Sequence, residues 1–112
     1  MTRRRSEGPV ARRIDWTARA LADLDAIAAY IERDDEDAAQ RWVLRLIEAA
    51  EKVATLPASG RRVPEFGRDD LREVIVGAYR IIYWIHDEHI EIVTIFEGHK
   101  RLRLPARVRD PG

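Results

Sequence analysis

The sequence of 112 residues contains no cysteine. A disulfide framework and a thiolate metal site are therefore excluded, and a reducing compartment is the simpler expectation. The basic residues near the N-terminus are not followed by the apolar stretch of a secretory signal. Apolar runs such as IIYWI are also far too short to span a bilayer. We expect a cytoplasmic protein with no membrane partner.

The chain also lacks an excess of charge of either sign, since 20 Lys and Arg residues balance 20 Asp and Glu residues. The total charge thus gives no indication of a nucleic-acid partner. Its distribution is uneven: residues 1–13 carry five arginines against one glutamate, and residues 14–56 carry five cations against ten acids. Residues 57–112 carry ten cations against nine acids. This asymmetry allows a local anion-binding surface on a neutral protein.

Apolar spacing predicts a strand and two helices in the first half of the chain. The strand ends at Trp16, and Thr17 is suited to cap the helix that follows. The second helix is predicted from an apolar stripe over residues 39–54, closed by a proline. The acidic run 34–37 separates the helices and suits the positive end of the second one. Because this connection is short, the helices should form an antiparallel hairpin.

Three strands are predicted after the helices, with the sequences LREVIV, YRIIYWI and IEIVTIF. The fold class is therefore α+β: an N-terminal strand, an antiparallel helical hairpin and a three-stranded antiparallel meander, with the helices on one face of the sheet. At this length the chain should form one domain. We place it at residues 10–104, between a flexible basic arm at 1–9 and a C-terminal tail at 105–112.

Alternation along YRIIYWI separates the two faces of that strand. The apolar face, which should lie under the helices, holds Tyr79, Ile81, Tyr83 and Ile85. The other face, expected to be open, holds Arg80, Ile82, Trp84 and His86. An arginine on an open face could hold a phosphate or a carboxylate through its planar fork. Spacing alone favours a simpler ion pair of Arg80 with Glu73 or Glu91 on a neighbouring strand.

In their order and lengths, these elements resemble the RelE/ParE superfamily of bacterial type II toxins. The resemblance covers residues 12–104 and rests on DLDAIAAYI in the first helix, AAQRWVLRLIEAAEKVATLP in the second, the YRIIY strand, and a final strand that ends in GHKR. It implies a growth-arresting toxin that is neutralised by a cognate antitoxin. Operator DNA would be bound only indirectly, through the antitoxin.

The resemblance implies two alternative activities, neither of which needs a cofactor. RelE-like toxins cut messenger RNA on the ribosome without a metal, and ParE-like toxins poison DNA gyrase. By resemblance to the nuclease pattern, Arg80 matches the sheet arginine, Lys100 or Arg101 matches the cation after the last strand, and His99 could be the acid or base. The nuclease set is otherwise incomplete, because LREVIV has no lysine and the tail after His99 has no Tyr, His or Glu.

The LP after the second helix and the GHKR ending resemble ParE, so gyrase poisoning is favoured. Ribosome-dependent RNA cleavage is the alternative, and an inactive antitoxin-binding module is the second alternative. A target-binding surface is predicted from the cations of the sheet, of the 57–70 loop and of the last strand's exit: Arg80, Arg61, Arg62, Arg68, His99, Lys100 and Arg101. We expect these exit cations to stand near the loop arginines, and Gly98 to let the chain turn where a side chain would crowd the sheet.

Two other groups of residues could carry chemistry, but a structural role is expected for both. His86 and His89 flank two acidic residues in a hairpin turn. Adjacent turn residues rarely converge on one ion, so no metal site is predicted. Trp42 lies on the apolar stripe of the second helix and is expected in the core.

Overall fold

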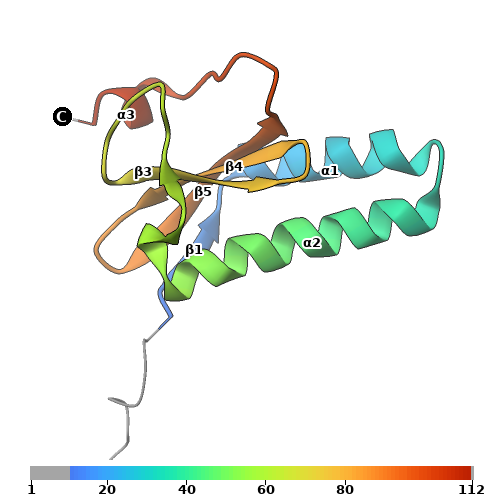
Figure 1. Cartoon of the computed structure of the whole chain (residues 1–112), viewed down its shortest axis with the longest axis horizontal. Coiled ribbons are helices and arrows are strands. Elements are labelled where there is room, and N and C mark those ends of the chain that lie inside the picture. The colour runs from blue at the N-terminus through green and yellow to red at the C-terminus, as the bar shows by residue number, and fades with distance from the viewer. Residues whose placement is uncertain (1–10, 112) are drawn as a thin grey trace, which may run out of the picture.

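The computed structural model describes residues 11–111, in which a helical hairpin packs on one sheet (Figure 1). The elements are β1 Arg13–Trp16, α1 Ala18–Glu32, α2 Glu36–Thr55, a 3-10 turn Pro57–Ser59, β2 Arg61–Arg62, β3 Leu71–Val76, β4 Tyr79–Ile85, β5 His89–Glu97 and α3 Ala106–Arg109. The α+β class, the hairpin and the β3–β4–β5 meander are confirmed. The predicted arm at residues 1–9 lies outside the described residues. No helix within 11–111 is long and apolar enough to cross a membrane.

The sheet has five strands in the order β1-β5-β4-β3-β2 and is mixed. β1 runs parallel to β5, with Arg13 opposite His89 and Asp15 opposite Glu91. A strand of four residues carries no pattern that distinguishes parallel from antiparallel pairing. β2 adds two residues to the outer side of β3 and was not predicted, because it lies in a loop rich in proline, glycine and arginine.

Side-chain caps define where both helices of the hairpin begin. The Thr17 hydroxyl accepts a hydrogen bond from the Ala20 amide at 3.0 Å and donates one to the Ile92 carbonyl of β5 at 2.9 Å. The predicted cap therefore also anchors α1 to the sheet. Asp35 accepts from the Ala38 amide at 3.1 Å, and two acidic residues follow it in the first turn of α2. Their charge complements the positive end of the helix dipole, as predicted.

The sheet face beneath the hairpin carries an apolar core. Ile81 and Tyr83 of β4 are fully buried against Leu46 of α2. Burial raises the pKa of the Tyr83 phenol, whose hydroxyl donates to the Pro57 carbonyl at 2.6 Å. The assignment of this face from strand alternation is confirmed, because its alternating apolar residues pack against the apolar stripes of the two helices.

Trp42 packs on the edge of this core, next to the β3–β4 turn. Its ring meets Tyr79 edge-to-face with centroids 5.5 Å apart, and it is partly buried, in agreement with the expected core role. Gly77 in the turn has φ of 60°, in the left-handed region, and the Trp42 ring lies directly on it. A side chain at Gly77 would both strain the turn and displace the indole.

The opposite sheet face was predicted to be open, but it carries a second apolar core. Its buried members are Val63, Leu71, Ile82, Val93, Leu104 and Val108. The loop before β3 and the segment with α3 cover this face, away from the tip of the helical hairpin (Figure 1). Val108 is fully buried, so the domain continues past residue 104 and residues 105–109 are not a separate tail. The apolar residues of these covering segments are isolated and follow neither helical nor strand periodicity. The sequence therefore did not predict that the segments pack on this face.

Candidate functional site

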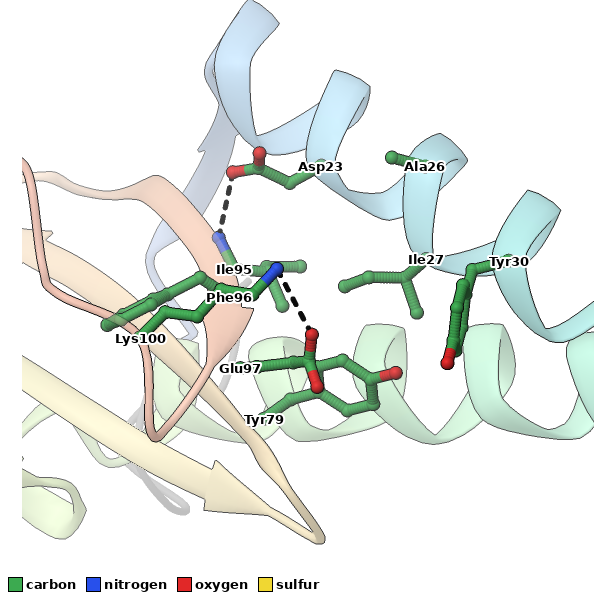
Figure 2. Close-up of a pocket in the computed structure, with 9 residues that line it drawn as sticks. All are labelled: Asp23, Ala26, Ile27, Tyr30, Tyr79, Ile95, Phe96, Glu97 and Lys100. Atoms are coloured by element: carbon green, nitrogen blue, oxygen red, sulfur yellow. Dashed lines mark hydrogen bonds and ion pairs between the residues drawn. The ribbon is translucent and has the colours of Figure 1, made fainter.

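A groove of about 360 Å³ lies between α1 and the ends of β4 and β5 (Figure 2). It is lined by Asp23, Ala26, Ile27, Tyr30, Tyr79, Ile95, Phe96, Glu97 and Lys100. The four α1 residues recur at helical spacing, so they present one side of the helix to the groove. The Tyr30 side of the groove is open, since this residue is 66% exposed. A large aromatic ring there offers apolar area to a partner.

Asp23 ties α1 to β5 at the floor of the groove. Its carboxylate accepts hydrogen bonds from the Thr94 hydroxyl at 2.5 Å and from the Ile95 amide at 3.1 Å. Figure 2 shows the second of these bonds. β1 pairs with β5 only as far as Ile92, so the next part of β5 has no strand on that side. The carboxylate therefore satisfies a backbone donor that would otherwise lack a partner, and it holds the floor rigid.

Two charged side chains stand where β5 leaves the groove. The Lys100 Nζ lies 3.2 Å from a carboxylate oxygen of Glu97 (Figure 2). Such an exposed pair contributes only about 0–1 kcal/mol, so either member can exchange its partner cheaply. Burial, and then the charge of Glu97, raises the pKa of the neighbouring Tyr79 phenol. The groove combines an apolar floor with a rim of mixed charge.

The predicted cations at the exit of the last strand all lie at the surface. His99, Lys100 and Arg101 are exposed, and His99 lies in a turn that is closed by a hydrogen bond from the Lys100 amide to the Glu97 carbonyl at 3.0 Å. The role expected for Gly98 is wrong, however. A Cβ at Gly98 would lie 3.5 Å from its nearest neighbours, an ordinary van der Waals distance, and its φ is not in the left-handed region.

Arg80 is held inside an ion-pair network instead of projecting from an open sheet. It is only 7% exposed. Its Nε donates to the Glu73 carboxylate at 2.7 Å, and its terminal nitrogens donate to the Glu65 carboxylate at 3.0 and 2.9 Å. Its guanidinium carbon also lies 5.0 Å from the centroid of the Phe96 ring. The ion pair with Glu73 that spacing favoured is confirmed, whereas Glu91 pairs with a different arginine.

The two carboxylates determine the electrostatic state of Arg80. Its hydrogen bond with Glu65 is the main cause that raises the pKa of Arg80, although burial opposes it. The same contact lowers the pKa of Glu65. A phosphate or carboxylate of a target could reach this guanidinium only if Glu65 moved away. Arg80 is therefore not freely available on the sheet, and its role in target binding stays a prediction.

Each of the three predicted loop arginines has a carboxylate partner. Arg61 pairs with Glu73, Arg62 with Asp69 at 2.6 Å, and Arg68 with Asp70 at 2.9 Å. Arg61 therefore belongs to the Arg80 network through the shared Glu73. The Arg61 and Arg62 side chains are largely exposed, so their pairs constrain them little.

Arg68 lies far from the exit cations. Its guanidinium is 5.9 Å from the Trp84 ring, near the β4–β5 turn. The exit cations follow Glu97, which pairs with Tyr79 at the opposite end of β4. The five strand steps between Tyr79 and Trp84 span roughly 16 Å. The expected placement of the exit cations near the loop arginines therefore fails for Arg68.

Most of the chain matches a known sequence family. A family model described as the ParE toxin of the type II toxin-antitoxin system parDE matches residues 14–102, from β1 to the segment after β5. The chain belongs to the ParE toxin family. It is thus a type II toxin of the RelE/ParE superfamily, as its resemblance implied.

Two relatives agree with this membership. The ParE-family chain is 44% identical over 93 residues to a Sinorhizobium fredii protein named "Putative toxin Y4kP", with 80% of this chain and 92% of the relative covered. It is 46% identical over 81 residues to toxin RelE2 of Caulobacter vibrioides, with coverages of 71% and 88%. Both relatives are named as toxins, and one of them carries the name RelE.

Solved structures share the fold of this ParE-family chain. The chromosomal ParDE toxin-antitoxin system from P. aeruginosa aligns with a TM-score of 0.65 at 21% identity, covering 78% of this chain and 96% of that one. The toxin-antitoxin complex RelBE2 from Mycobacterium tuberculosis aligns with a TM-score of 0.59 at 20% identity, with coverages of 81% and 95%. At these identities the likeness concerns the fold.

One cluster in this ParE-family chain was not predicted. The His86 Nε2 lies 3.1 Å from a carboxylate oxygen of Glu91, and the His86 and His89 rings stack with centroids 4.3 Å apart. The carboxylates considered from the sequence were the two between the histidines. The carboxylate that contacts His86 is that of Glu91, which lies two residues beyond His89 on the same face of β5. Period-two spacing could have revealed it.

Proposed function

We propose that this ParE-family toxin arrests growth by binding DNA gyrase, and that a cognate antitoxin holds it inactive. The match of residues 14–102 to the ParE toxin family carries the proposal. The toxin acts in the cytoplasm and touches operator DNA only through its antitoxin. No cofactor takes part in this inhibition.

The arrangement of the predicted cations supports binding more than RNA cleavage. A general acid or base must lie within about 3 Å of the proton it moves, with cations on the same phosphate. Arg80 is occupied by two carboxylates, and Arg68 lies at the other end of β4 from His99. The exposed Lys100 and Arg101 can still meet an acidic protein surface through charge complementarity.

The groove beside α1 is the proposed contact for the antitoxin. It offers the exposed Tyr30 ring, the Ile27 side chain and an exchangeable Lys100–Glu97 pair (Figure 2). A segment that is disordered alone can fold along such a surface and bury enough apolar area to offset its ordering. The ParDE and RelBE2 structures, which share this fold, are those of toxin-antitoxin systems, and this supports the assignment.

Ribosome-dependent cleavage of messenger RNA is the second candidate, because the relative with 46% identity is named toxin RelE2. In that case His99 carries a proton during cleavage, and Glu65 releases Arg80 to the phosphate. An inactive member that only binds an antitoxin is the remaining alternative, and it needs the groove alone.

Two assays with the purified protein separate these functions. We expect inhibition of supercoiling by gyrase with trapped cleaved DNA, and no cleavage of messenger RNA on programmed ribosomes. Codon-positioned cuts that disappear in His99→Gln would replace the gyrase proposal with the nuclease. Silence in both assays, together with antitoxin binding, would identify the inactive module.

Substitutions at the exit of β5 sharpen the distinction. Reversing Lys100 and Arg101 to Glu should abolish gyrase inhibition through charge alone. His99→Gln should have a mild effect, whereas in a nuclease it would cost about a hundredfold or more in cleavage. Reversing the exposed Arg41 and Lys52 of α2 to Glu changes the net charge equally and serves as the control. If the control inhibits gyrase as weakly as the exit variant, the exit cations are not the binding surface.

The antitoxin contact is tested by co-expression with the neighbouring gene of the operon, followed by size-exclusion chromatography. A stable complex is expected, and Tyr30→Asp should weaken it by placing a charge in the groove. Leu56→Asp, at an exposed apolar residue at the end of α2, is the matched control. No complex with the natural chain would refute the proposed partner.

A further inference from the structure

Three neighbouring strands bring four potential metal ligands to one corner of the sheet. β5 lies between β1 and β4, and Asp15 of β1 is opposite Glu91. His86 and His89 face each other across the β4–β5 turn, where the His86 amide donates to the His89 carbonyl at 2.9 Å. Because side chains alternate along a strand, His89 and Glu91 share a face with Asp15 beside them.

The side chains of this corner are close enough to share one ion. One ligand atom from each of His86, His89 and Glu91 lies within 4.8 Å of the others. The Asp15 carboxylate lies 3.6 Å from the His89 Nε2. In a tetrahedral zinc site the ligand atoms are roughly 3.4 Å apart, as bonds of about 2.0–2.2 Å require. For His86, His89 and Glu91, side-chain rotations that shorten these separations by roughly 1 Å would bring the ligand atoms to the spacing of a zinc site.

Burial fits the same geometry. Glu91 is buried at the base of the corner, whereas both histidines are only partly buried. Their rings are stacked, with an interplanar angle of 10°, so at least one ring must turn before both lone pairs point at one ion. A partly exposed ring can do this without disturbing the core. The corner therefore has one fixed carboxylate and two adjustable imidazoles.

Two imidazoles with carboxylates form a donor set that suits zinc and similar divalent transition-metal ions. We propose that Asp15, His86, His89 and Glu91 form a zinc-binding site at the β1–β5–β4 corner. Bound zinc ties the N-terminal strand to the β4–β5 turn and stabilises the folded state by mass action. The site is distinct from the groove beside α1 and does not depend on whether gyrase or the ribosome is the target.

Two arginines compete with zinc for the carboxylates. Arg107 pairs with both oxygens of Glu91, and Arg13 donates to Asp15 at 2.9 and 3.0 Å. The Arg107 and Arg13 side chains are 55% and 66% exposed. The Arg13–Asp15 pair is exposed and contributes little, and Arg107 is the exposed partner of the buried Glu91, so an ion at the corner can displace both arginines. The paired carboxylates also keep the corner close to neutral before an ion binds.

The test is a zinc titration of the full chain after chelator treatment and removal of any affinity-tag histidines. Calorimetry should show saturable binding of one ion per chain. Tryptophan fluorescence should change in parallel, because the Trp84 ring lies 4.4 Å from the His86 ring. His86→Gln and His89→Gln should each weaken binding by at least roughly tenfold, a loss seen even for residues that only support metal ligands.

The third histidine of the chain supplies the matched control. His99 lies outside the corner, so His99→Gln should bind zinc with unchanged affinity. Zinc should also raise the melting temperature of the natural chain and of His99→Gln, but not that of His89→Gln. If the histidine variants fail to fold without zinc, Asp15→Asn is measured in their place. The hydrogen-bond partner of Asp15 is exposed, and this variant should bind zinc more weakly than the natural chain, with a smaller loss than the histidine variants. Absence of saturable binding, or equal loss in His99→Gln, would overturn the site.

Discussion

The two faces of the sheet are both covered, but by different kinds of structure. Under the helical hairpin, two continuous apolar stripes meet a face of aliphatic and aromatic side chains. The other face packs Ile82 and Val93 against isolated apolar residues of a loop and the C-terminal segment. Beside this second core lies the buried pair of Arg80 and Glu73. Helices supply unbroken apolar area, whereas loops leave gaps that polar groups must fill with partners.

This difference separates two sources of stability. The hairpin face depends on the apolar area it removes from water, a contribution that involves no titrating group. The loop-covered face also depends on charged contacts with defined geometry, so single side chains and acid should disturb it. Arg80, one of the cations first considered for target binding, lies beside this second face, where its carboxylate partners limit its availability.

The largest effect is expected in the hairpin core. Leu46 is fully buried, and Leu46→Ala should lower the free energy of unfolding by about 4 kcal/mol through lost burial and the cavity left behind. Leu44 on the same helix is 59% exposed, so Leu44→Ala should change it by no more than about 0.5 kcal/mol. Urea unfolding of both variants measures the contrast. Similar losses would show that exposure does not distinguish the two leucines.

Arg80→Ala comes next, and it tests the charged network of the loop-covered face. Removing one member of a buried pair costs about 3–5 kcal/mol. We expect a value near 3 kcal/mol, because Arg61 still neutralises Glu73. Arg61→Ala, which removes an exposed partner of the same carboxylate, should cost about 1 kcal/mol or less. An Arg80→Ala variant as stable as the natural chain would show that the network is not a structural element.

Val108→Ala tests whether the C-terminal segment belongs to the domain. Val108 is fully buried against the loop-covered face, and losing its two methyl groups should cost about 2 kcal/mol. Arg103→Ala, at an exposed position of the same segment, should have almost no effect. Chemical unfolding of the two variants provides the measurement. If Val108→Ala were as stable as the natural chain, residues 105–109 would be a tail that contributes nothing to the stability of the domain.

Acid should produce the smallest effect, again on the loop-covered face. Hydrogen bonds from Arg80 and Arg68 hold the pKa of Glu65 and of Asp70 below their ordinary values, against the effect of burial. A carboxylate with a depressed folded-state pKa contributes stability above its unfolded value near pH 4, and loses it as pH falls through the folded value. Both groups are partly exposed, so each should contribute about 1 kcal/mol or less.

The urea midpoint should therefore stay level from pH 7 to 5 and decline below about pH 4. Glu65→Gln should already be less stable at neutral pH and lose less on acidification than the natural chain. Glu48→Gln, on the exposed side of α2, is the control that should follow the natural chain. Identical pH profiles for all three proteins would show that Glu65 does not contribute to the loss of stability in acid.

Local patterns were sufficient for the elements that pack in regular layers. The apolar stripe over residues 39–54 predicted α2, and alternation predicted β3 to β5 and the side of β4 that faces the hairpin. They were insufficient for the pairing direction of β1 and for α3. Four residues do not encode a pairing direction, and Val108 is a single apolar residue among charged neighbours.

The sequence by itself determined the toxin fold, its helical hairpin and the list of residues able to carry charge. Only the tertiary structure decided what those charges meet. Arg80 had two possible partners by spacing, and folding buried it between Glu73 and Glu65. His86 and His89 had two carboxylates between them, yet strand register selected Glu91 and brought Asp15 from the start of the chain. The physical reason is that a charged group responds to its distance from other charges and to its exposure to water, and both are set by contacts between segments remote in sequence.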